Sequence, residues 1–92
     1  MAATLVADAR VKGRPQRWTV VIDGRKAGML ERWASGSAFP FHAYVGGGRE
    51  AESVGTFHPA DYAGKDPLGQ SREAAITAVV AAHAERRYDH AT

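Results

Sequence analysis

Four cations stand at nearly every second position near the start of the chain: Arg10, Lys12, Arg14 and Arg17. In an extended segment, alternate side chains share one face, and a line of cations on one face suits contact with the phosphates of a nucleic acid. A basic terminal segment that stays in water has the same composition. Both interpretations are open from the sequence.

Charge is unevenly distributed along the chain. Residues 1–49 hold eight Lys or Arg against three Asp or Glu, a net charge of +5, and residues 50–92 hold four against seven, a net charge of −3. The basic half indicates a polyanionic partner. The alternative is a solvated arginine-rich surface, because Arg outnumbers Lys nine to three.

The residue types used in catalysis do not form a motif. The run Gly46–Gly48 is followed by Arg49 and Glu50 instead of Lys and Ser or Thr, so it predicts a hairpin tip and not a phosphate loop. There is no cysteine, and no serine lies in a Gly-x-Ser-x-Gly elbow. The candidate acid/base carboxylates lie on expected loops, and the sequence does not fix their separation; they are Glu50, Glu52, Asp61 and Asp66. We therefore expect a protein that is not an enzyme and uses no cofactor.

Metal ligation is not indicated either. His58 and Asp61 are three residues apart and His83 and His90 seven apart, so neither makes a His-x3-His pair, and a metal site would have to be assembled from separate segments. We expect His83 to border the core, and His42 and His58 to lie on the surface.

The segment from Ser71 to Arg87 is the only one with a sustained helical period. Ser71 is the expected N-cap, because its hydroxyl can accept a hydrogen bond from a free amide of the first turn. The apolar stripe is formed by Ile76, Val79, Val80 and His83, widened by Ala75, Ala78 and Ala82. A contact face made mostly of alanine lets a helix lie close to its partner surface, so the large core side chains must come from that surface.

The clearest strand runs from Arg17 to Asp23, with Trp18, Val20 and Ile22 on one face. Asp23-Gly24 predicts a hairpin turn into a return strand over residues 26–33. Either Met29 with Trp33 or Leu30 faces the core there, because a slip of one residue exchanges the faces. We favour the register that brings Leu30 opposite Trp18.

Further strands are predicted over residues 39–45 and 53–57, and a long connection over 58–70 with one helical turn near Ala60 to Tyr62. Residues 2–11 form either an irregular strand or part of a loose basic arm, residues 1–16. The predicted fold is α+β, a single domain over residues 1–92 in which an antiparallel sheet of three to four strands carries one C-terminal helix on one face. No run of about 18 apolar residues occurs, and with no cysteine we expect a cytoplasmic protein that does not enter a membrane.

The run Trp18-Thr-Val-Val-Ile-Asp-Gly-Arg-Lys, followed by later strands and the helix start Ser71-Arg-Glu-Ala-Ala-Ile, resembles the sheet-plus-helix DNA-binding arms of phage-type integrases and the related AP2 domains. Those modules lay the sheet into the major groove and contact DNA through basic residues on it. The resemblance implies such contacts from Arg17, Arg25, Lys26 and Arg32. The alternating cations add Arg14.

A second hypothesis gives the uncovered sheet face to a protein partner. The chain would then be a protein-binding modulator or a homodimerising accessory protein, of phage type for example. The expected anchors are Val21, Trp33 and Tyr44.

Overall fold

The computed structural model describes residues 3–33 and 39–91, with side chains up to residue 86. Five strands precede one helix: β1 (Ala3–Ala7), β2 (Gln16–Ile22), β3 (Arg25–Arg32), β4 (Phe41–Val45), β5 (Glu52–Phe57) and α1 (Pro67–Ala91). Two single 3-10 turns, η1 (Gly48–Glu50) and η2 (Pro59–Asp61), lie in the connections. The α+β class and the C-terminal helix are confirmed.

The strands form one open antiparallel sheet in the order β1-β2-β3-β4-β5, so each strand pairs only with its neighbours in sequence. The β2–β3 turn is the predicted Asp23-Gly24 hairpin, with both residues at positive φ (52° and 78°). Trp18 pairs with Leu30, and Leu30 is fully buried, which confirms the favoured register.

The predicted number of strands, three to four, is too low. Residues 3–7, inside the expected basic arm, form β1 and pair with β2 from Ala3–Ile22 to Ala7–Trp18. Alanine is depleted in strands, but edge pairing with β2 satisfies the backbone groups of β1 and lets Leu5 pack against the core.

The helix begins four residues earlier than predicted, at Pro67. Asp66 caps it, because one carboxylate oxygen accepts a hydrogen bond from the Gly69 amide at 2.9 Å. Proline is favoured at the first helical position, where its missing N–H costs nothing. Ser71, the expected cap, is instead buried inside the helix and donates from its hydroxyl to the Leu68 carbonyl at 2.7 Å.

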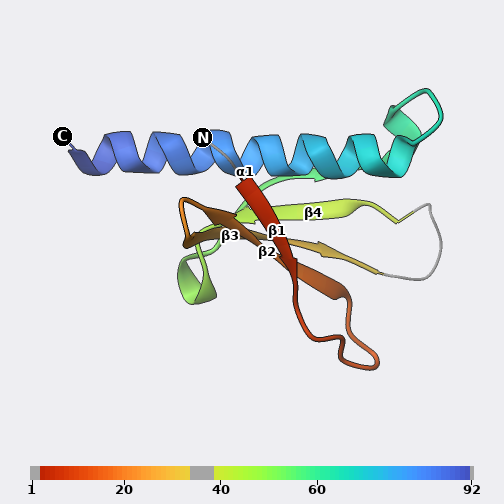
Figure 1. Ribbon diagram of the computed structural model, residues 1–92, viewed down its shortest axis with the longest axis horizontal. Coiled ribbons are helices and arrows are strands. Elements are labelled where there is room, and N and C mark those ends of the chain that lie inside the picture. The colour runs from red at the N-terminus through yellow and green to blue at the C-terminus, as the bar shows by residue number, and fades with distance from the viewer. Residues whose placement is uncertain (1–2, 34–38, 92) are drawn as a thin grey trace.

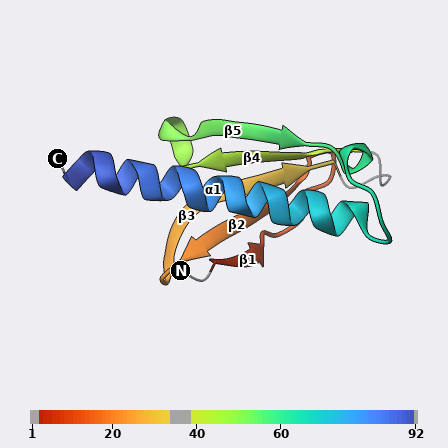
Figure 2. The ribbon, with the colours of Figure 1, turned by 90° about the horizontal axis from the view of Figure 1, so that it is seen from above.

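The helix lies on one face of the sheet, and Figure 2 shows it running lengthwise over the sheet, close to the direction of β4 and β5 and oblique to β2 and β3. Its most buried positions, Ser71, Ala75 and Val79, are spaced by four residues, and Ile76 and Val80 pack beside them. The largest fully buried side chains are mostly on the sheet, as predicted: Phe41, Ile22, Leu30 and Val20.

Gly28 sets the closest approach between the two layers. A Cβ built on it would lie 2.7 Å from Cγ1 of Val79 and 2.2 Å from the backbone oxygen of Tyr44. Both distances are far below van der Waals contact, so only a residue without a side chain fits beneath α1 at this position.

We predict that Gly28→Ala destabilises the protein by on the order of 3 kcal/mol, because the new methyl group must push α1 or β4 away. Gly47→Ala is the matched control, since its Cβ would meet only the Lys26 side chain at ordinary distances of 3.6 and 3.7 Å. Urea unfolding followed by circular dichroism measures both. Equal stabilities for the two variants would contradict the close approach.

Candidate binding surface

The face of the sheet opposite α1 is uncovered, and we call it the open face (Figure 1). Side chains alternate along each strand, so residues flanking the buried Val20, Leu30 and Ala43 point to the open face. The register arranges them in three rows across the strands: Thr4–Val21–Lys26, Val6–Thr19–Met29–Tyr44–Ser53, and Arg17–Glu31–His42–Thr56.

The structure brings two of the three expected protein-binding anchors onto the open face. Val21 and Tyr44 lie there, both partly exposed. Met29 and Val6, which sequence reasoning did not select, share the middle row with Tyr44. Trp33 directly follows β3 and is 47% exposed. The register that places Leu30 inside also places Met29 outside, and it depends on the bulge at Ala27, which the turn residues do not reveal.

The predicted basic residues do not gather on the open face. Arg17 lies there, but its Nε is 2.8 Å from Oε2 of Glu31, an ion pair that neutralises it. Lys26 lies there opposite Val21. Arg25 pairs with the inward-facing Ile22 and borders a shallow hollow with His83 of α1, so it belongs to the helix side.

Arg32 also lies on the helix side and is only 8% exposed. Its Nε donates to the Phe39 carbonyl at 2.9 Å, and its guanidinium carbon lies 5.6 Å from the centre of the Phe41 ring. The expectation that these arginines share one basic sheet face is therefore wrong, because β3 alternates and Arg32 falls in the same row as the inward-facing Gln16.

Arg14 lies in the connection between β1 and β2, residues 8–15, which we call the basic loop. Its base is fixed by hydrogen bonds: the Gln16 side-chain amide donates to the carbonyls of Asp8 and Arg17, and the Thr19 hydroxyl donates to Asp8. Its tip is a turn in which the Arg14 amide donates to the Val11 carbonyl, with Gly13 at φ 80°.

The basic loop presents three exposed cations: Arg10, Lys12 and Arg14. None of them forms an ion pair with any residue that the structure describes. The one acid of the loop, Asp8, accepts a hydrogen bond from Thr19. Figure 1 shows the loop projecting on the side of the sheet away from α1. The alternation of cations in the sequence is thus kept, but on a turn and not on a strand.

Exposed apolar side chains lie at the same end of the sheet as the basic loop. Gln16 pairs with Arg32 at that end, so Trp33 leaves the sheet beside Pro15. Phe39, which precedes β4, is 41% exposed, and Val11 in the loop is 54% exposed. Proteins that bind single-stranded nucleic acids combine exposed aromatic rings with exposed cations in this way.

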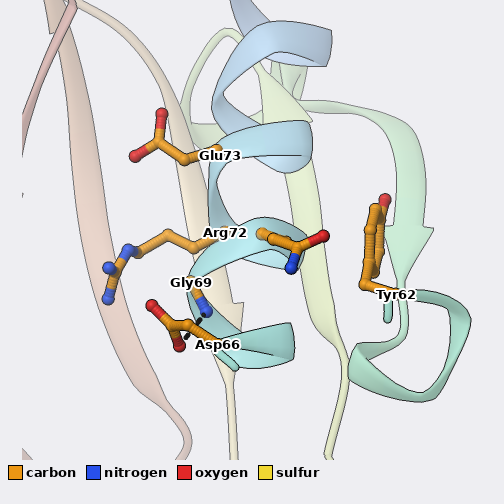
Figure 3. A pocket seen from close by; sticks show the side chains of 6 residues that line it. Tyr62, Asp66, Gly69, Arg72 and Glu73 are labelled. Atoms are coloured by element: carbon orange, nitrogen blue, oxygen red, sulfur yellow. Dashed lines mark hydrogen bonds between the residues drawn. The ribbon is translucent and has the colours of Figure 1, made fainter. Parts of the chain in front are cut away.

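A shallow pocket lies at the start of α1 (Figure 3), lined by Tyr62, Asp66, Gly69, Gln70, Arg72 and Glu73. Asp66 is occupied in capping the helix, as the dashed line shows. Arg72 and Glu73 extend to one side of α1, and Tyr62 stands on the other. The polar groups therefore do not converge on a common point.

The histidines are separate from one another. His42 on the open face has its Nδ1 3.3 Å from the Thr56 hydroxyl, and His83 borders the hollow beside Arg25. Within residues 3–33 and 39–86, no three His, Cys, Asp or Glu side chains are grouped as metal ligands would be. In the same part of the chain, no helix has the length and apolar character needed to cross a bilayer.

Comparison with known proteins finds no matching family model, no matching curated protein and no matching solved structure.

We predict that Arg32→Ala lowers the free energy of unfolding by about 2 kcal/mol, because it removes a charged hydrogen bond from a nearly buried site. Arg25→Ala, at an exposed position, should change it by less than about 0.5 kcal/mol. Urea unfolding distinguishes the two. A neutral Arg32→Ala would contradict the contribution of this side chain to the stability of the fold.

Proposed function

We propose that the chain is a non-enzymatic nucleic-acid-binding module that contacts single-stranded segments through the basic loop and Trp33. The observation that carries the proposal is the set of three unpaired cations, Arg10, Lys12 and Arg14, held at the end of the sheet where Trp33 is half exposed. The site differs from the sheet-in-groove arrangement of integrase arms and AP2 domains.

The charges of the loop favour phosphates as ligands. Cations that already neutralise an acid gain little from a second anion, whereas Arg10, Lys12 and Arg14 have no such partner within the described residues. Each phosphate contact releases a condensed counterion, which makes the affinity depend on salt.

The exposed indole favours bases in a single strand. Stacking needs an accessible ring face and a base that is free of its duplex, and it contributes about 1–3 kcal/mol per base. Trp18, the other tryptophan, is packed against Phe41 with ring centres 5.5 Å apart, so it belongs to the core. Trp33 is therefore the indole that can offer a face to a ligand.

Replacing Arg10, Lys12 and Arg14 together by alanine should weaken binding to an oligothymidylate and make the slope of log K against log salt shallower by about 2, at roughly 0.7 per lost contact. The matched control is the triple alanine variant of Arg25, Arg49 and Lys65. These residues are also exposed, and replacing them removes the same amount of positive charge. Fluorescence anisotropy at several salt concentrations measures both variants. Equal slopes for the two triple variants would mean that binding depends only on the net charge of the protein. If the unmodified protein does not bind at low salt, the proposal is wrong.

Trp33→Ala should lower the affinity for oligothymidylate by about 5- to 100-fold, the equivalent of one stacked base. Trp33→Phe keeps an aromatic face and should retain most of the affinity. The same measurement with a blunt duplex should show a much smaller effect of Trp33→Ala. An equal loss on duplex and single strand would contradict the stacking role.

A further inference from the structure

The open face carries an apolar middle that no residue of the described ranges 3–33 and 39–86 covers. Val6 is 50% exposed, and Val21, Met29 and Tyr44 are partly exposed around the centre of the sheet. The molecule has two layers, so these side chains have α1 behind the sheet and no described element in front (Figure 1). A contiguous apolar area of this kind marks a contact surface.

The charge of the open face suits a protein surface better than a polyanion. Its rows carry three charged residues, Arg17, Lys26 and Glu31, and Arg17 and Glu31 already form an ion pair. The Asp8 carboxylate, which accepts a hydrogen bond from Thr19, adds a negative charge on this face. A nearly neutral face with an apolar centre gains little from phosphates. It gains from a second face of the same character.

The arrangement of the face is self-complementary. Met29 lies on β3, the third of the five strands, and in the middle of the three rows. Lys26 lies toward one end of β3 and Glu31 toward the other, on either side of Met29. A two-fold axis through Met29 and perpendicular to the strands would bring Glu31 of each copy toward Lys26 of the other. Opposite charges related in this way fix the register of an isologous contact.

We infer that the open face is occupied by a second copy of this chain, in a two-fold symmetric dimer centred on Met29. The unbranched thioether of Met29 can adapt to its own copy across the axis. Val6 and Tyr44, which share the row of Met29, extend the apolar contact to either side.

The expected contact area is modest. Five strands about 4.8 Å apart and three rows about 6.7 Å apart cover roughly 500 Å² per copy, so a dimer buries roughly 1,000 Å² in total, near the lower bound for specific interfaces. The dimer should therefore form reversibly in the micromolar range.

The test is light scattering of the full chain from low-micromolar to near-millimolar concentration, without nucleic acid, so that it is independent of the proposed function. We expect the mass to rise from 9.9 kDa toward twice that value. The unfolding temperature should rise with concentration over the same range, because association stabilises the folded state. A monomeric mass at every concentration would overturn the inference. This result is also the one expected if a different protein covers the open face.

Met29→Lys and Val21→Lys should each raise the dimer dissociation constant at least 10-fold, because each brings a charge into the contact. Ala81→Lys, on the exposed side of α1, is the matched control and should leave it unchanged. Circular dichroism confirms that each variant is folded. If Ala81→Lys dissociates the dimer and Met29→Lys does not, α1 is the contact surface and the inference is wrong.

Discussion

The contact of Val79 with the bare backbone at Gly28 determines how the two layers of this protein fit together. The helix is rich in alanine and can lie close to the sheet only where the sheet offers no side chain. Larger residues then fill the space on either side of the contact. The Phe41 ring is tilted against the Trp18 ring, and Ile22 and Leu30 are fully buried. The core is thin, and its bulk is supplied almost entirely by the strands.

This one-sided core also decides where charge is placed. Arg32 points toward the helix and is accommodated by the Phe39 carbonyl and the Phe41 ring, so it serves the fold. Arg17 points outward and is matched by Glu31. The unmatched cations on the open side of the described molecule are Lys26 and those of the basic loop. No strand pairing constrains the loop cations to alternate between faces.

Local patterns predicted the parts of the fold that depend on neighbouring residues. The Asp23-Gly24 turn begins the β2–β3 pairing, and the bulge at Ala27 then shifts the register by one residue, which turns Leu30 inward. Two features of the fold were not predicted: the start of α1 and the strand β1. Ser71 resembles an N-cap, but Asp66 followed by Pro67 is the better start. The strand β1 has weak propensity and exists because β2 offers an edge.

The candidate site was harder to predict than the fold. Whether a basic residue faces solvent depends on strand register and on irregularities such as the shift between Val20 and Val21. That shift decides the side on which Arg25 and Lys26 lie, and periodicity does not reveal it. The alternation of Arg10, Lys12 and Arg14 was visible in the sequence, but their position on a turn beside Trp33 needed the pairing of Gln16 with Arg32.

The meander has a kinetic consequence. Since each strand pairs only with its sequence neighbour, the sheet can assemble hairpin by hairpin through short loop closures, which favours rapid early pairing. However, α1 follows all five strands, so a newly paired sheet presents both of its faces to water until the helix docks. During that interval the chain is most prone to associate with other unfinished chains, and the speed of helix docking sets how long this vulnerable stage lasts.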